Sequence, residues 1–188
     1  RRFRKVIVTE GFTDVIALHR HNITHSVSTM GLRLSDAQVE LIKRAGARTV
    51  TLMRDGDASG ISAMERDAKL LKAHGLEVDV CPMPPGEDPD SLSKRFFINR
   101  DDFARWIRNA TRTVPSWKVE SIYKSKMEDI LSYNSKIHLI RNEQLDEVIA
   151  ILREEEDLIE RDLLIHQYSH LFNISSGALL EKVNQVTS

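Results

Sequence analysis

The first hundred residues alternate short β-rich runs with longer stretches of helical spacing, and this alternation limits the folds open to the chain. Runs rich in apolar or β-branched residues lie at residues 6–8, 23–28, 48–53 and 76–80. The stretches between them place apolar side chains three and four positions apart, which is typical of amphipathic helices. Strands separated by helices indicate a parallel sheet with helices on its faces. We therefore predict an α/β domain with a mostly parallel, four-stranded central sheet.

Beyond Pro115 the chain changes character, with no convincing strand and no further glycine until Gly177. Apolar residues recur there at helical spacing, which favours a packed helical unit. The predicted helices cover residues 117–132, 135–153, 157–171 and 175–186. Residues 111–115 are interpreted as a linker. We therefore divide the chain into an α/β domain, residues 1–113, and an all-α helical subdomain, residues 114–188.

The composition limits the kinds of partner that the chain can hold. Its 188 residues carry 27 basic and 28 acidic side chains, and this net charge of −1 is not typical of a protein held on nucleic acid by bulk charge. The single cysteine, Cys81, rules out an internal disulfide and fits a reducing cytoplasm. No apolar run approaches the roughly 20 residues that a membrane helix needs. We therefore predict a cytoplasmic protein without a membrane partner.

Acidic residues follow two of the predicted strands at the points where these end. Glu10 follows the first strand, and Asp55 and Asp57 follow the third. Because the ligands of open parallel sheets gather at the carboxyl ends of the strands, these side chains are expected to share one site. Clustered carboxylates raise each other's pKa values, and a divalent cation relieves their repulsion. Ligands that are all oxygens suit Mg²⁺, so we predict a metal site at this edge.

Glycines and a second acidic group surround this predicted site. Gly56 and Gly60 suit a tight turn in which the backbone approaches a phosphate or a metal. The helix expected from Gly60 would point the positive end of its dipole toward the same place. The proline-rich segment after the fourth strand carries the second acidic group: Glu87, Asp88 and Asp90. This group would support the first metal ion or bind a second one.

Each of these signals has a simpler interpretation when it is taken alone. Asp-Gly-Asp at residues 55–57 is a common turn, and Glu-Gly after a strand is a still weaker signal. The acidic segment at residues 87–90 could be a solvated loop with a helix cap at Asp90. Their joint occurrence in this order, each at the carboxyl end of a strand, favours a metal site.

At these positions the chain resembles the Toprim fold, a module shared by bacterial primases, topoisomerases and some nucleases. Residues 9–15 (TEGFTDV) resemble its first motif, and residues 55–60 (DGDASG) resemble its second. Residues 86–92 (GEDPDSL) resemble a loop of the bacterial replicative (DnaG-type) DNA primases, and this is the most specific motif of the chain. The resemblance extends from about Val6 to Val183.

The resemblance implies a chemistry and a set of site residues. The activity of these primases is the joining of ribonucleotides on a single-stranded DNA template with Mg²⁺ or Mn²⁺, which makes them nucleotidyltransferases. Carried over to this chain, the catalytic metal ligands would be Glu10, Asp55 and Asp57. Two further metal ligands would come from the acidic loop: Asp88 and Asp90. The residues expected to contact the substrate are Gly11, Asp14, Gly56 and Gly60.

The resemblance also implies partners, and the chain departs from the family pattern at two positions. Primases of this type use ribonucleoside triphosphates at the replication fork, and they bind the replicative helicase through a domain that this chain does not contain. Their zinc-binding and basic parts also lie outside this sequence, which would account for its near-neutral charge. Ala58 stands where a basic residue is common in the family, and Arg54 stands where an aromatic or apolar residue is common.

Two other interpretations remain open. A Toprim nuclease or topoisomerase would share the metal ligands. A type IA topoisomerase also needs a catalytic tyrosine in a separate domain, and the tyrosines here, Tyr123, Tyr133 and Tyr168, lie in ordinary helical patterns. A non-catalytic replication module would keep the fold as a binding platform and would be expected to lose one or more carboxylates. All the expected carboxylates are present in this chain.

Overall fold

The computed structural model describes residues 4–31, 33–96, 99–132 and 142–185. Contacts between Cα positions divide the chain into two compact units, Arg1–Val114 and Pro115–Ser188. The sequence had placed this division between residues 113 and 114. Within the described residues, no helix is both long enough and apolar enough to cross a membrane.

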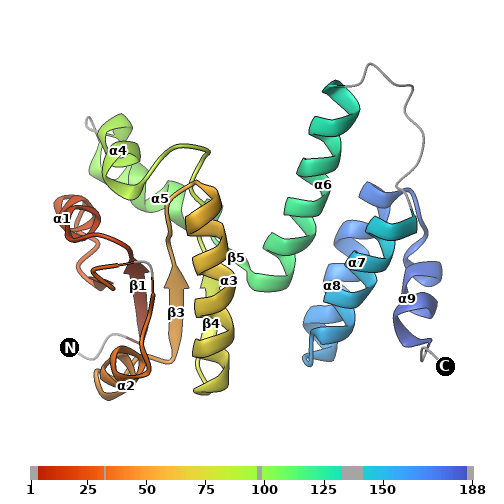
Figure 1. The fold of residues 1–188 in the computed structure, drawn as a ribbon, viewed down its shortest axis with the longest axis horizontal. Helices are drawn as coiled ribbons and strands as arrows, with labels where there is room; N and C mark the ends of the chain where they lie inside the picture. Colours follow the sequence, from red (N-terminus) through yellow and green to blue (C-terminus); the bar gives the residue numbers. More distant parts are fainter. Residues whose placement is uncertain (1–3, 32, 97–98, 133–141, 186–188) are drawn as a thin grey trace. The chain divides into compact units, whose positions relative to one another are not determined.

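Unit 1 is built on one five-stranded sheet with the order β2-β1-β3-β4-β5 (Figure 1). Its strands are β1 (Lys5–Thr9), β2 (Ser26–Ser28), β3 (Thr49–Leu52), β4 (Glu77–Val80) and β5 (Arg112–Thr113). The first four strands are parallel to one another, and β5 runs antiparallel beside β4. The predicted α/β class and the mostly parallel sheet are confirmed.

The fifth strand corrects the sequence prediction, which expected four strands and a linker at residues 111–115. Arg112 and Thr113 instead pair with β4 at the edge of the sheet. A two-residue strand is too short to show a periodic pattern, so the sequence carried no signal for it. Helix α6 begins directly afterwards at Val114. Pro115 is tolerated in its first turn because the backbone N–H that proline lacks would have no partner within the helix there.

The described part of unit 1 also contains helices between and after its strands. They are α1 (Phe12–Arg20), α2 (Asp36–Arg44), α3 (Ala58–Ala73), α4 (Pro89–Ser93), the 3-10 helix η1 (Lys94–Phe96) and α5 (Arg100–Ala110). Polar side chains cap the helices that follow β2 and β3. The Ser35 hydroxyl accepts a hydrogen bond from the Gln38 amide at 3.3 Å, and the Asp57 carboxylate accepts one from the Gly60 amide at 2.7 Å. These caps define where α2 and α3 begin.

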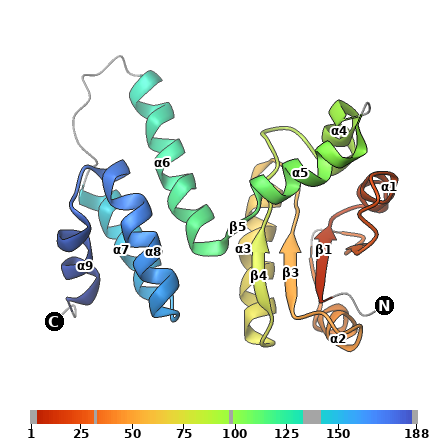
Figure 2. The ribbon, with the colours of Figure 1, turned by 180° about the vertical axis from the view of Figure 1, so that it is seen from behind.

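Two apolar layers cover the faces of the sheet. Val8 and Leu52 are fully buried, and because side chains alternate along a strand, their neighbours Ile7 and Met53 point to the opposite face. There, Ile7 and Met53 belong to a cluster that includes residues of α1, α4 and α5: Leu18, Leu92, Phe103 and Ile107. Figures 1 and 2 show α3 and α5 on opposite faces of the sheet. The sheet is therefore covered on both sides, as is usual for parallel strands.

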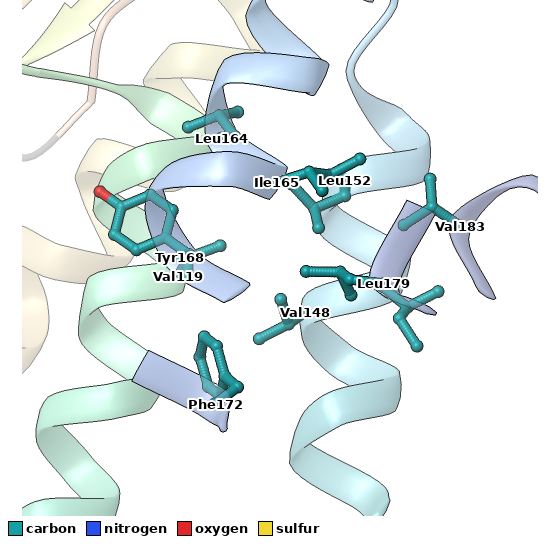
Figure 3. Packing of buried hydrophobic residues seen from close by; sticks show 10 residues of the cluster. Val119, Val148, Leu152, Leu164, Ile165, Tyr168, Phe172, Leu179 and Val183 are labelled. Carbon is teal, nitrogen blue, oxygen red and sulfur yellow. The ribbon is translucent and has the colours of Figure 1, made fainter. Parts of the chain in front are cut away.

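The described part of unit 2 contains helices and no strand, as predicted. Its elements are α6 (Val114–Ser132), α7 (Asn142–Glu154), α8 (Leu158–Tyr168), the 3-10 helix η2 (Ser169–Phe172) and α9 (Ser176–Asn184). Buried side chains from these elements form one cluster (Figure 3): Val119, Val148, Leu152, Ile165, Tyr168 and Leu179 are among them. The hydroxyl of Tyr168 hydrogen-bonds with Ser116 at 2.6 Å and Glu120 at 2.9 Å. The first part of the helix predicted at residues 135–153 lies outside the described residues.

Leu52→Ala is expected to lower the free energy of unfolding by about 2 to 5 kcal/mol, because Leu52 is fully buried in β3. Leu41→Ala is the matched control. The Leu41 residue on α2 is 62% exposed, so its truncation should change stability by less than about 0.5 kcal/mol. Urea unfolding followed by circular dichroism measures both changes. An equal decrease in the free energy of unfolding in the two variants would contradict the assignment of Leu52 to the core.

Candidate active site

A cavity of about 350 Å³ opens where the parallel strands end, at the edge that carries the predicted acidic residues. Four stretches of chain line it, one after each parallel strand. They contribute Glu10, Gly11, Phe12, Thr13, Asp14, Met30, Gly31, Asp55 and Asp88. The predicted site residues Glu10, Gly11, Asp14, Asp55 and Asp88 therefore share one cavity.

The loops after β3 and β4 are joined backbone to backbone beside this cavity. The Gly56 amide donates to the Glu87 carbonyl at 2.9 Å, and the Gly86 amide donates to the Gly56 carbonyl at 2.9 Å. A Cβ atom at residue 56 would lie 2.0 Å from the carbonyl oxygen of Pro84. Only glycine allows the two loops to approach this closely.

Gly60, in the first turn of α3, is restricted in a similar way, since its Cβ atom would lie 2.1 Å from the carbonyl oxygen of Asp55. Neither Gly56 nor Gly60 lines the cavity. Close backbone packing therefore accounts for both glycines, and the substrate contacts expected of them remain predictions.

Asp14 links the segment after β1 to the acidic loop. It is buried, and its Oδ2 accepts a hydrogen bond from the Gly11 amide at 2.9 Å. Burial raises the pKa of Asp14, although hydrogen bonds from the backbone amides of Gly11 and Asp90 oppose the rise. The charges of Asp88 and Asp90 raise this pKa further. The carboxylate therefore organises the start of α1 while it remains close to the other acidic groups.

Glu10 and Asp55 each bury a carboxylate oxygen without a hydrogen-bond donor. Within the described residues, no group donates to Glu10 Oε1 or to Asp55 Oδ1. Burial, reinforced by neighbouring carboxylate charges, above all that of Glu10, raises the pKa of Asp55 to about 6. Burial also raises the pKa of Glu10, and the positive charge of Arg54 and a hydrogen bond from the Asp55 backbone amide to the Glu10 carboxylate oppose this rise. Buried carboxylate oxygens of this kind are unfavourable unless a cation or a proton compensates them.

These two carboxylates fit a divalent cation in their chemistry, because ligands that are all oxygens suit Mg²⁺ or Mn²⁺. As folded, the described residues include no group of three or more His, Cys, Asp or Glu side chains arranged to hold a metal ion. Mg²⁺ commonly binds through one or two carboxylates and keeps waters and substrate phosphates as its other ligands. Glu10 and Asp55 therefore match the number and the type of protein ligands in a site of that kind.

The other predicted metal ligands have partners within the protein. Asp57 lies outside the cavity lining, and its carboxylate caps α3. Asp88 lines the cavity, but its Oδ1 also accepts a hydrogen bond from the Ser91 amide at 2.6 Å and so caps α4. Asp90 lies outside the lining and forms an ion pair with Lys94 at 2.9 Å. The metal-binding roles of Asp57, Asp88 and Asp90 remain predictions.

Sequence reasoning missed the apolar side of the cavity and a buried ion pair near Glu10. Phe12 and Met30 line the cavity although they are 59% and 69% exposed, so they form an apolar rim. Arg54 and Asp67 form an ion pair in which both side chains are fully buried. Two signals for the burial of these side chains were readable: Arg54 directly follows the strand predicted at residues 48–53, and Asp67 falls on the buried stripe of α3.

Comparison with known proteins agrees with this architecture. Residues 7–93 match the Toprim-like family. This part of the chain has a Toprim-like fold. It contains every candidate carboxylate: Glu10, Asp14, Asp55, Asp57, Asp88 and Asp90.

Over almost its whole length, the chain is similar to bacterial DNA primases. It is 29% identical over 182 residues to a DNA primase of Halalkalibacterium halodurans and 26% identical over 182 residues to one of Clostridium acetobutylicum. These matches cover 97% and 95% of the chain, but only 29% and 28% of the two primases. The chain therefore corresponds to one part of these longer relatives.

Solved primase structures share the fold. A primase of Aquifex aeolicus, solved with its zinc-binding and RNA polymerase domains, is 25% identical with a TM-score of 0.58, and the match covers 95% of this chain and 40% of that one. The RNA polymerase domain of the Mycobacterium tuberculosis primase, in complex with double-stranded DNA, has a TM-score of 0.65 at 19% identity. That match covers 92% of this chain and 52% of the other. The chain therefore has the fold of part of a primase polymerase core.

Gly56→Ala is expected to lower the free energy of unfolding by about 1 to 3 kcal/mol, because the new Cβ atom would collide with the Pro84 carbonyl. Gly31→Ala is the control, since no atom lies within 4 Å of a Cβ atom built there. Thermal and urea unfolding of both variants measure the difference. If Gly56→Ala were as stable as Gly31→Ala, the close approach of the two loops would be wrong.

Asp55→Asn is expected to stabilise the metal-free protein at about pH 8, by on the order of 1 kcal/mol once screening by solvent is allowed for. The folded state holds the Asp55 proton up to a pKa of about 6, whereas the ordinary pKa is 3.8. The unchanged protein therefore loses stability as the pH rises from 3.8 to about 6, because the Asp55 proton must be released from the folded state. Asp55→Asn carries no such proton and does not lose this stability.

The advantage of Asp55→Asn should consequently disappear below about pH 4, where Asp55 is protonated in both states. Urea unfolding in EDTA at the two pH values measures this difference. Asp79→Asn is the control, because the Asp79 carboxylate pairs with Lys5 at 2.7 Å and does not line the cavity. An equal advantage for Asp55→Asn at both pH values would contradict the electrostatic origin assigned to it.

Proposed function

We propose that the chain is the metal-binding part of a DNA primase polymerase core, which joins ribonucleotides into short RNA primers on single-stranded DNA. The observation that carries the proposal is the pair of buried carboxylate oxygens without donors, on Glu10 and Asp55, in one cavity at the sheet edge. Similarity to DNA primases over 97% of the chain supports it. In this proposal unit 1 is the catalytic domain and unit 2 is the helical subdomain of the core.

Glu10 and Asp55 would hold a divalent cation, with Asp88 in the same cavity and with Asp57 and Asp90 as further ligands beside it. Bound Mg²⁺ or Mn²⁺ would lower the pKa of the attacking 3′-hydroxyl and neutralise the charge on the leaving pyrophosphate. No carboxylate of the protein needs to act as a nucleophile in this reaction. The task of the acidic residues is to bind the metal and to orient it.

Other residues around the cavity would bind and orient the nucleotide. Asp14 accepts the hydrogen bond of the Gly11 amide and so holds the segment that carries Glu10. Helix α3 starts at the carboxyl edge of the sheet, where the amides of its first turn favour a phosphate group. Phe12 and Met30 offer an exposed apolar contact for the base or the ribose.

The template, the ribonucleoside triphosphates and the replicative helicase are proposed partners. A net charge of −1 provides no bulk attraction to DNA. Because the chain spans only 29% of the length of its relative from H. halodurans, we propose that other parts of a longer protein supply most template contacts and bind the helicase. The proposed place of action is the replication fork, in the cytoplasm.

The test is a primer-synthesis gel with single-stranded DNA, labelled ribonucleotides and Mn²⁺, run with the 188-residue chain and with a full-length protein that contains it. Short RNA products are expected, and Asp55→Asn or Glu10→Gln should reduce them more than about 100-fold. Loss of an outer partner of a metal ligand already lowers activity 10- to 100-fold, so the loss of a ligand should do more.

Asp79→Asn is the matched control, because it removes an acidic group that lies outside the cavity lining. It should retain RNA synthesis. RNA products of equal yield in Asp55→Asn would overturn the proposed site. Shortened DNA without RNA, lost in Asp55→Asn, would replace the primase proposal with a Toprim nuclease.

A further inference from the structure

Arg54 is the largest fully buried side chain among the described residues, and it directly precedes Asp55. Its guanidinium forms an ion pair with Asp67 of α3, which is also fully buried. Arg54 Nη1 donates to the Thr29 hydroxyl at 2.9 Å and to the Thr9 carbonyl at 3.4 Å. One side chain therefore connects the ends of β1, β2 and β3 with helix α3.

The partners of Arg54 lie next to residues of the candidate site. Thr9 immediately precedes Glu10, and the Thr9 carbonyl also accepts a hydrogen bond from the Thr29 amide at 3.0 Å. Thr29 immediately precedes Met30, which lines the cavity. Through Thr9 and Thr29, Arg54 therefore holds the backbone of two of the stretches that form the cavity wall.

The energetics of a buried ion pair argue against a role in stability alone. Removing two charges from water is costly, and apolar residues of similar volume in place of such a pair are often neutral or stabilising. Within the described residues, Arg54 Nε has no hydrogen-bond partner, which adds to this cost. The pair is therefore better explained by its position beside Glu10 and Asp55.

We propose that Arg54 is a positioning residue of the candidate metal site, and that Asp67 holds it in place. Arg54 fixes the backbone that carries Glu10 relative to the backbone that carries Asp55, so that both carboxylates reach one cation. The inference rests on the metal site of the proposed function. It also gives a role to Arg54, which the sequence analysis named as one of two departures from the family pattern.

Arg54→Lys tests the proposal, because lysine keeps the positive charge but cannot bridge Thr9, Thr29 and Asp67 at once. Since the charge is kept, a change in metal affinity reports on geometry. We expect the affinity for Mn²⁺ to fall at least about tenfold, as is typical when an outer partner of metal ligands is lost. Titration calorimetry of the 188-residue chain with Mn²⁺ measures the affinity directly. An unchanged affinity would overturn the proposal.

Two further variants separate positioning from loss of stability. Leu71→Ala is the matched control, since Leu71 is fully buried in α3, the helix that also carries Asp67. It should lower the melting temperature and leave Mn²⁺ affinity unchanged. Arg54→Met combined with Asp67→Leu removes both charges at similar volume, so it should fold even if Arg54→Lys does not. Its Mn²⁺ affinity should also fall, and an affinity equal to or tighter than that of the original chain would overturn the proposal.

A measurement without metal distinguishes failure of this inference from failure of the proposed function. If the original chain binds no Mn²⁺, the proposed metal site is wrong. The positioning role is then decided by hydrogen exchange at the Thr29 amide, which donates to the Thr9 carbonyl. Faster exchange in Arg54→Lys than in Leu71→Ala supports the role of Arg54, and equal exchange overturns it.

Discussion

The parallel pairing of β1 with β3 is the interaction on which the candidate site depends. Val8 and Leu52 are partners in this register, so the two strands end within one residue of each other, and the register continued by two residues brings Glu10 level with Arg54, next to Asp55. Both partners are fully buried, and a slip by one residue would turn them to the opposite faces of the sheet. The apolar core therefore brings the carboxylates of Glu10 and Asp55 close together, although the two charges would repel one another in a free chain.

The acidic edge and the apolar core make opposite contributions to stability. Burial raises the pKa values of Glu10, Asp14 and Asp55, which means that folding disfavours their charged forms. The layers on both faces of the sheet offset this cost, and the partners of Asp14 offset part of it locally. Groups that weaken the fold in this way are a common property of functional sites.

The parts of the fold that follow a repeating pattern could be predicted from the sequence. Four parallel strands and the carboxylates at their ends follow from apolar runs and the residues that come directly after them. The strand at Arg112 and Thr113 could not be predicted, because its pairing with β4 depends on a neighbour distant in sequence. The burial of Arg54 and of Asp67 had readable signals, but their pairing did not, because it requires α3 to be packed on the sheet first. The caps made by Asp57 and Asp88 were not predicted, although an Asp directly before a helix is a common capping signal, because the sequence analysis interpreted Asp57 as a metal ligand and placed a possible cap at Asp90.

The backbone contact at Gly56 has a consequence for the choice of ligand. Its hydrogen bonds to Glu87 and Gly86 join the loop next to Asp55 to the loop that carries Asp88. These hydrogen bonds and the close approach of Gly56 to Pro84 oppose an outward movement of the acidic loop, so the two loops form one connected wall of the cavity. A bulkier ligand would have to find room beside Phe12 and Met30, which line the same cavity and are exposed. Selection by size would therefore take place at the apolar rim, while the acidic wall keeps its dimensions.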